Sequence, residues 1–208
     1  MTIMVERKNK GASMLVKELL QQLRNVLMDQ EKTRWDDSEL LDYYNECKRV
    51  MSAERIEDKT TATMTLQDDK FTYDTTGILR YISCKDADGV VRPLYPDDST
   101  GDNDGDGIVI QSYNRVYVND PTIGTSLTFK IVALPPADNL ESDVRIGDEE
   151  AMKYYILSKA YEKEDDTENF AKSDTFYAKY SKIFEKLIDS ASVGYSYQQD
   201  QKTKTIFY

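Results

Sequence analysis

The chain has 208 residues, which suits one domain or one domain with a large insertion, and it carries a formal net charge of -11. A protein whose main task is to grip phosphate backbones is normally basic, so this charge argues against stable nucleic-acid binding. The sequence contains no histidine, which excludes Ser–His and Cys–His catalysis and histidine-ligated zinc.

The two cysteines, Cys47 and Cys84, lie far apart and lack the spacing of a metal site or a disulfide framework. An intracellular or intravirion setting therefore fits the chain better than a secreted one. No stretch approaches the roughly 20 apolar residues that a membrane-spanning helix needs, so we expect no membrane partner.

The first part of the chain predicts an arm followed by a helix. Residues 1–12 are polar and slightly basic, which is typical of a mobile N-terminal arm. From residue 13 to about residue 30, apolar side chains recur with the 3.6-residue period of an amphipathic helix. The polar connection 31–33 is so short that the next helix should lie antiparallel to the first.

The second helix is predicted to begin at a joint that contains the only tryptophan of the chain. Asp36 is suited to be its N-cap residue, and Glu39 three residues later completes a capping-box pattern. Trp35 directly precedes the cap, where a hydrophobic residue can pack onto the first helical turn. Direct contact of Trp35 with a ligand is the alternative to this packing role. The helix should run to about residue 53.

The hydrophobic period changes after this helix, and residues 57–145 predict strands. Alternating side chains occur at residues 60–66, 108–118 and 126–134, and Asp-Ala-Asp-Gly at residues 86–89 is a hairpin-turn signal. Short strands joined by turns favour an antiparallel β lobe or a small barrel, inserted between helical segments.

Two further helices are predicted in residues 146–191, with a break near residues 164–167. Residues 192–208 show no helical period, so we expect an extended C-terminal arm there. The predicted fold is therefore α+β. Two helical hairpins, in residues 13–56 and 146–191, form a four-helix bundle-like core, because neither hairpin can bury its apolar stripe alone.

One local pattern indicates a metal site. Residues 102–109 match the first eight positions of an EF-hand-like calcium loop, in which Asp102, Asp104 and Asp106 converge on one cation. The twelfth position, which should supply a bidentate carboxylate, is Tyr113, and a strand pattern follows instead of a helix. A flexible acidic hairpin loop without metal is the alternative, because Asp and Gly are common in solvated turns.

Two groups of segments carry a family resemblance. The first is Leu-Met-Asp-Gln at residues 27–30, followed by residues 34–45, which open with Arg-Trp-Asp-Asp. The second is the proline pair within residues 133–136, a Tyr-x-Leu-x-x-Ala pattern within residues 148–161, and the helix that contains residues 178–184. This arrangement resembles the head-to-tail adaptor (connector, head completion) proteins of tailed bacteriophages. The resemblance covers about half of the chain, mainly the helices, and the β insertion and the Asp-rich loop depart from it.

The resemblance implies a structural virion protein that forms a ring, usually of twelve copies, between the capsid portal and the tail. Portal and tail proteins would be its partners, and DNA would pass through the bore, where an acidic surface avoids retaining it. The protein would be made in the bacterial cytoplasm and located in the virion neck. The C-terminal arm would dock on the portal or a neighbouring chain through Tyr195, Tyr197, Ile206, Phe207 and Tyr208.

Two other functions fit the same patterns. One is another neck component, such as a tail-completion or stopper protein, and the other is a calcium-stabilised binding module built on the Asp-rich loop. The sequence has no P-loop, dinucleotide fingerprint or Gly-x-Ser-x-Gly elbow, so we expect no enzymatic activity. Calcium is the only cofactor that the sequence suggests.

Overall fold

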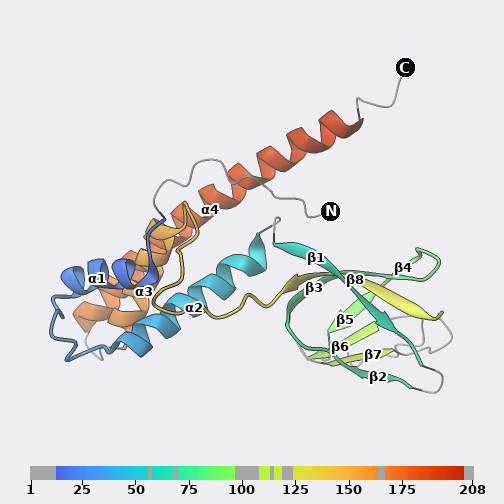
Figure 1. Ribbon diagram of the computed structural model, residues 1–208, viewed down its shortest axis with the longest axis horizontal. Coiled ribbons are helices and arrows are strands. Elements are labelled where there is room, and N and C mark those ends of the chain that lie inside the picture. Colours follow the sequence, from blue (N-terminus) through green and yellow to red (C-terminus); the bar gives the residue numbers. More distant parts are fainter. Residues whose placement is uncertain are drawn as a thin grey trace, which may run out of the picture. The chain divides into compact units, whose positions relative to one another are not determined.

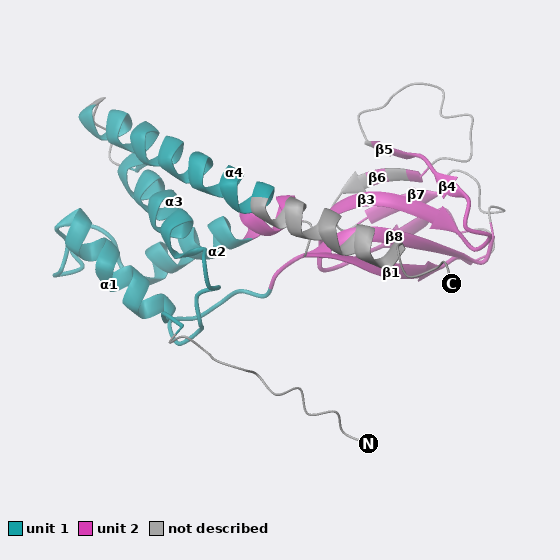
Figure 2. Ribbon diagram, turned by 90° about the horizontal axis from the view of Figure 1, so that it is seen from above, with its two compact units in different colours: residues 1–48, 136–208 teal, residues 49–135 magenta. Residues whose placement is uncertain are grey.

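The computed structural model describes residues 13–55, 58–67, 70–96, 108–112, 115–118, 124–163 and 167–203. Within these ranges the chain forms four helices and eight strands, which confirms the predicted α+β class (Figure 1). The chain divides into two compact units (Figure 2). Unit 1 comprises residues 1–48 and 136–208, and unit 2 comprises residues 49–135.

The helices are α1 (Val16–Leu27), α2 (Asp37–Glu54), α3 (Glu149–Glu162) and α4 (Thr167–Thr203). Helices α3 and α4 form an antiparallel hairpin. The Ser173 hydroxyl donates to the carbonyl oxygen of Ser158 (2.9 Å), and the rings of Tyr155 and Tyr180 meet edge to face at 5.1 Å. Helix α1 also contacts α3. The packing of all four helices as one bundle stays a prediction.

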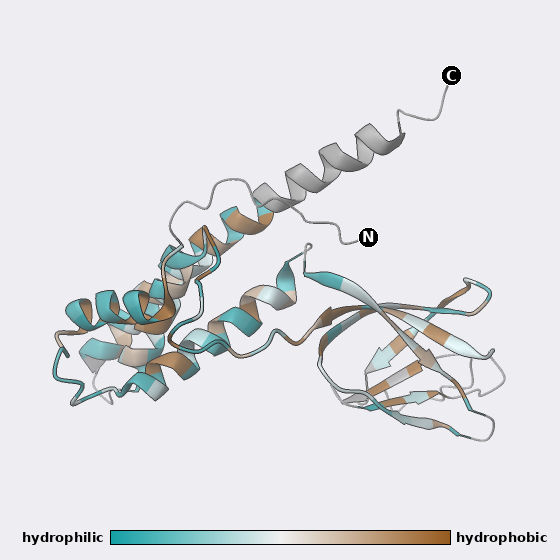
Figure 3. Ribbon diagram, in the orientation of Figure 1, coloured by the Kyte–Doolittle hydropathy of each residue, from teal (hydrophilic) through white to brown (hydrophobic). Residues whose placement is uncertain are grey.

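Helix α1 follows directly from its apolar stripe. Its buried face contains Val16, Leu19 and Leu23, and Figure 3 shows hydrophilic and hydrophobic residues alternating along this helix. The helix ends before the predicted residue 30 because Met28 adopts a left-handed conformation with φ 53°, which stops helical propagation. The N–H of Asp29 then donates back to the carbonyl oxygen of Arg24 (3.0 Å).

The segment that begins with Pro136, the second proline of the pair, belongs to unit 1, although the predicted β insertion extended to residue 145. The carbonyl oxygens of Ser142 and Leu140 accept hydrogen bonds from the N–H groups of Val16 and Lys17, each at 3.0 Å. The first N–H groups of a helix have no partner within the helix. This segment supplies such partners to α1, which explains why it packs with the helices.

Unit 2 contains the strands β1 (Lys59–Thr65), β2 (Thr72–Asp74), β3 (Ile78–Asp86), β4 (Val91–Arg92), β5 (Leu94–Pro96), β6 (Ile108–Ser112), β7 (Arg115–Val118) and β8 (Ser126–Ala133). They form two four-stranded sheets, with the orders β1-β8-β3-β4 and β2-β7-β6-β5. No described strand pairing joins the two sheets, so the structure has no closed barrel, and the barrel alternative is wrong.

All described strand pairs are antiparallel except β5 with β6, which are parallel. The predicted antiparallel lobe is therefore confirmed at every described pair except this one. A parallel pair needs a crossover connection, whereas a tight turn gives an antiparallel pair. Residues 97–107 separate β5 from β6 along the sequence, which is too long a stretch for a tight hairpin turn.

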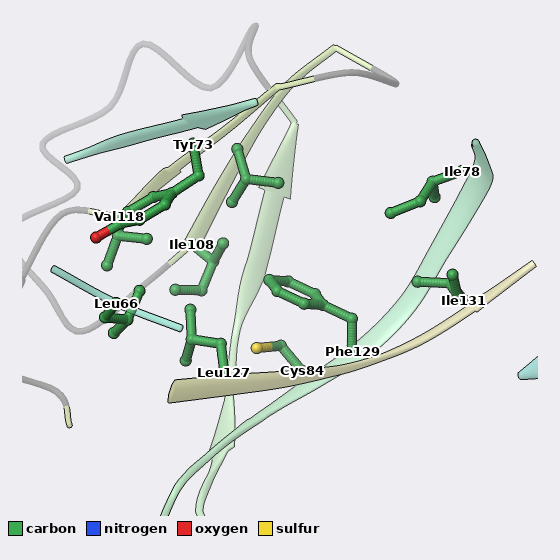
Figure 4. Packing of buried hydrophobic residues seen from close by; sticks show 10 residues of the cluster. Leu66, Tyr73, Ile78, Cys84, Ile108, Val118, Leu127, Phe129 and Ile131 are labelled. Atoms are coloured by element: carbon green, nitrogen blue, oxygen red, sulfur yellow. The ribbon is translucent and has the colours of Figure 1, made fainter. Parts of the chain in front are cut away.

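A hydrophobic core fills unit 2 (Figure 4). On β8, Leu127, Phe129 and Ile131 are buried whereas Lys130 is exposed, which is the period-2 pattern of a strand with one face on a core. The cluster of buried residues comprises Leu66, Tyr73, Ile78, Cys84, Ile108, Val116, Val118, Leu127, Phe129 and Ile131. Strand β8 pairs with both β1 and β3, so it is central to the first sheet.

The predicted extended arm is wrong for residues 192–203, because α4 continues to Thr203. The backbone hydrogen bonds of a helix form within the helix, so a helical backbone can extend beyond the part that an apolar period marks in the sequence. This stretch contains Gln198, Gln199, Gln201 and Lys202, all good helix formers, although Gly194 weakens the helix by about 1 kcal/mol. Residues 1–12 and 204–208 lie outside the described residues. No helix in the described part of the chain is both long and apolar enough to span a membrane.

Candidate functional site

A buried ion pair organises the joint between α1 and α2. A guanidinium nitrogen of Arg24 lies 3.1 Å from a carboxylate oxygen of Asp29, and the two residues are 1% and 2% exposed. Arg24 also donates to the carbonyl oxygen of Trp35 (2.8 Å) and to the carboxylate of Asp37 (2.7 Å). One cation thus connects the last turn of α1, the connection and the first residue of α2.

The Asp29 carboxylate holds the connection itself. It accepts hydrogen bonds from the N–H groups of Thr33 (2.9 Å), Arg34 (3.2 Å) and Trp35 (3.2 Å), and from the Thr33 hydroxyl (3.1 Å). Burial alone would raise the pKa of this carboxyl group. The hydrogen bonds, with that from Trp35 the strongest, outweigh burial and lower the pKa. Asp29 is therefore ionised at neutral pH, as its pairing with Arg24 requires.

Asp36 occupies the N-cap position of α2. Its Oδ1 atom accepts hydrogen bonds from the N–H of Glu39 (2.8 Å) and from the Ser38 hydroxyl (2.6 Å). Both hydrogen bonds lower the pKa of Asp36, and the bond from Ser38 has the larger effect. The next carboxyl group, Asp37, also has a lowered pKa because Lys32 and then Arg24 bind it.

The Glu39 carboxylate makes contacts that the capping-box pattern does not predict. The hydroxyl of Tyr43 donates to it (3.0 Å), and the Lys163 ammonium lies 2.7 Å away. Lys163 directly follows α3, so Glu39 connects the start of α2 with the end of α3. Burial, followed by the Glu39 hydrogen bond, raises the pKa of Tyr43 to about 12.

Trp35 is a packing residue of this joint. Its side chain is buried, and the Arg34 guanidinium lies 4.5 Å from the ring centroid. The indole N–H has no hydrogen-bond partner among the described residues. An indole in this position stabilises unit 1 through its burial, and it is not exposed to a ligand in solution.

A polar network joins α2 to the segment that follows unit 2. The Asp138 carboxylate lies 2.8 Å from the Lys48 ammonium and accepts a hydrogen bond from the Tyr44 hydroxyl (3.2 Å). The side-chain amide of Asn45 donates to the carbonyl oxygen of Asp138 (3.2 Å), and its oxygen accepts a hydrogen bond from the Asp138 N–H (2.8 Å). Burial, reinforced by Asp138, raises the pKa of Tyr44. The sequence showed only an acidic linker here.

A second polar contact joins α2 to α3. The Tyr155 hydroxyl donates to Glu46 (2.8 Å), and the Lys159 ammonium lies 3.9 Å from the same carboxylate. Burial and then this hydrogen bond raise the pKa of Tyr155. Across the described part of unit 1, ionisable groups therefore fix helices to one another, an arrangement that suits a rigid scaffold.

The predicted calcium ligands Asp102, Asp104 and Asp106 lie outside the described residues. Within the described ranges, no group of three or more carboxylate or cysteine side chains is placed to hold a metal ion. The calcium site therefore stays a prediction.

The predicted docking residues of the C-terminal segment stay predictions as well. Tyr195 and Tyr197 lie on the helical backbone of α4, and the structure does not describe their side chains. Ile206, Phe207 and Tyr208 lie outside the described residues.

Replacing Asp29 by alanine should lower the free energy of unfolding of unit 1 by about 3–5 kcal/mol, because it removes the buried counter-charge of Arg24. Urea unfolding followed by the fluorescence of Trp35, the only tryptophan, measures this loss. The control Asp42→Ala removes an exposed carboxylate of α2 and should change stability by less than about 0.5 kcal/mol. A loss below about 1 kcal/mol for Asp29→Ala would contradict the role given to the pair.

Acidification should weaken the same joint. The folded-state pKa values of Asp29, Asp36 and Asp37 lie below the ordinary value of 3.8, so their stabilising contribution is complete above that value. It is lost as the pH falls through the folded-state values. The unfolding free energy reported by Trp35 should therefore decrease from about pH 5 to about pH 3. The decrease should be smaller in Asp29→Asn; an equal decrease would exclude Asp29 as a contributor.

Comparison with known proteins gives the family of this scaffold. The SU10 adaptor protein family model matches residues 14–202, which include α1, α2, α3, all eight strands and all but the last residue of α4. No curated protein matches the chain. The match covers far more than half of the sequence and extends beyond the helical segments that suggested a phage adaptor. The chain therefore belongs to the SU10 adaptor protein family, a family of phage head-to-tail adaptor proteins.

Proposed function

We propose that the protein forms a ring that joins the portal of a tailed phage capsid to the tail and lines the channel through which DNA leaves. The observation that carries this proposal is the adaptor-family match over residues 14–202. The match spans the helices and the strands, so the role belongs to the whole scaffold. The resemblance implies twelve copies in the ring, located in the virion neck after synthesis in the bacterial cytoplasm.

The polar contacts of unit 1 support a structural role without enzymatic activity. Glu39 with Lys163, Glu46 with Tyr155 and Asp29 with Arg24 each fix two segments of the helical unit. An adaptor needs surfaces that keep their shape while partners bind them, and such contacts provide that stiffness.

The charge of the chain supports a channel that releases DNA. Each copy carries a formal net charge of -11, so a ring would repel the phosphate backbone instead of holding it. DNA would pass through without sequence-specific binding. The acidic net charge also distinguishes the proposed ring from a DNA clamp, which would need a basic bore.

The end of the chain is the proposed docking segment for the portal or a neighbouring chain. Helix α4 continues to Thr203, and Ile206, Phe207 and Tyr208 follow it in the sequence. Apolar and aromatic side chains close to a chain end can fill pockets of a partner surface. Tyr195 and Tyr197 belong to the same proposed segment.

The ring is tested by producing the chain together with the portal protein of its phage. Negative-stain images of the purified complex should show a cyclic layer on the portal, and native mass spectrometry should count its copies. A single copy bound at the side of the portal would contradict the proposal. A ring that binds tail proteins but not the portal would favour the alternative neck role, that of a tail-completion or stopper protein.

Truncation after Thr203 should abolish attachment to the portal, because it removes Ile206, Phe207 and Tyr208 while leaving α4 whole. Truncation after residue 191 should give the same loss and serves as the larger deletion. Co-purification with the portal measures attachment, and circular dichroism checks that the helices remain. Unchanged attachment of both truncated chains would show that this segment is not the anchor.

The Asp-rich loop is proposed to bind calcium through Asp102, Asp104 and Asp106, on the strength of their spacing alone. Isothermal calorimetry with calcium chloride should then give a binding signal that the triple Asp→Asn variant loses. If no heat of binding is measured at millimolar calcium, the loop is an acidic turn without metal, and a calcium-stabilised module is excluded.

A further inference from the structure

A ladder of aromatic rings lies along one side of the α3–α4 hairpin. The ring of Phe176 on α4 stacks on Tyr154 (6.1 Å between centroids, 20° between planes) and on Tyr161 (5.6 Å, 15°), both on α3. All three side chains are partly exposed. The rings therefore do more than fill the space between the helices, because one side of the ladder faces solvent.

Two lysines of α4 are held over this ladder. The Lys179 ammonium lies 5.3 Å from the Tyr154 centroid and 5.2 Å from that of Phe176, and the Lys172 ammonium lies 5.7 Å from that of Tyr161. Cation–π contacts fix each ammonium in place. Lys172 also pairs with Glu168, one turn earlier (2.8 Å). We call Tyr154, Tyr161, Lys172, Phe176 and Lys179 the basic edge.

The other side of α4 carries the opposite charge. At about 100° per residue, Lys172 and Lys179 lie within about 20° of each other around the helix axis. The buried residues Ser173, Tyr180 and Phe184 form a stripe about 80–120° further round. Further round, about 140–220° from Lys172, lie Phe170, Asp174, Tyr177 and Glu185, and we call these four residues the acidic edge.

The acidic edge is exposed in the isolated chain. Phe170 is 46% exposed and Tyr177 is 52% exposed, and the side chains of Asp174 and Glu185 also face solvent. Aromatic side chains are enriched in the cores of protein interfaces, and charged groups of opposite sign guide their partners into register. Each edge of α4 therefore has the composition of one half of an interface, with complementary charge.

We propose that the basic edge of one copy docks on the acidic edge of a second copy. Two different surfaces of the same chain give a head-to-tail contact, which generates a ring when the rotation between copies closes. In such a ring the two neighbours of each copy cover both of its edges, whereas DNA on the basic edge would leave Phe170 and Tyr177 uncovered. The net charge of -11 also disfavours DNA as the occupant. This inference rests on the proposed ring and identifies the surfaces that build it.

Charge reversal tests the contact. Lys172→Glu with Lys179→Glu makes both edges acidic, and Asp174→Lys with Glu185→Lys makes both edges basic. Neither variant alone should form a ring with the portal, by native mass spectrometry and negative-stain imaging. An equimolar mixture should restore a ring in which the two variants alternate. The control Lys85→Glu with Lys130→Glu makes the same charge change on exposed residues of unit 2 and should assemble like the natural chain.

The outcomes separate the two proposals. A natural chain that forms no ring would overturn the proposed function together with this inference. A natural chain that forms a ring, with both reversal variants assembling equally well alone, would overturn this inference only. A basic-edge variant that keeps the ring but no longer retains a duplex DNA oligonucleotide would show that DNA is the occupant.

Folding of the variants is checked by circular dichroism. If a reversal lowers the melting temperature by more than about 5 °C, the neutral variant Lys172→Gln with Lys179→Gln replaces it. This variant should raise the protein concentration needed to form the ring on the portal about tenfold, because about 1.4 kcal/mol of lost contact energy changes the dissociation constant tenfold. An unchanged concentration would also overturn the inference.

Discussion

The joint between α1 and α2 depends on one cation, the guanidinium of Arg24. Removing a charge from water is costly, and the pairing with Asp29 offsets that cost only because the remaining donors of Arg24 reach the carbonyl of Trp35 and the carboxylate of Asp37. These hydrogen bonds are directional and join particular atoms, so they restrict the joint more than an apolar contact would. The pair therefore fixes the geometry in which α2 leaves α1.

The rest of unit 1 is connected to α2 in the same manner. Glu39 reaches the residue that follows α3, and Asn45 and Lys48 bind the segment after unit 2. Lys48 also donates to the carbonyl oxygen of Pro136 (2.9 Å), so the last residue of unit 1 before unit 2 contacts the first residue after it. The chain therefore enters and leaves unit 2 at two residues that are hydrogen-bonded to each other. Unit 1 can therefore keep its geometry without contacts from the strands of unit 2.

The sequence predicted what depends on neighbouring residues and missed what depends on distant ones. The helix of Val16–Leu27, the N-cap Asp36 and the alternation along Ser126–Ala133 follow from local periods and caps. Arg24 lies inside an amphipathic helix, where a charged residue is normally assigned to solvent, so its burial depended on a counter-charge in the following turn. The partners of Asp138 and the parallel β5–β6 pair are equally invisible to a local pattern.

Helix α4 is the element whose length the fold of a single chain does not explain. Its 37 residues span about 55 Å, whereas the 14 residues of α3 span about 21 Å, so α3 covers less than half of it. Isolated helices are marginally stable in water, because most helical stability comes from packing. In the proposed ring, the oppositely charged edges would bring neighbouring α4 helices side by side, so that assembly would add packing contacts along α4.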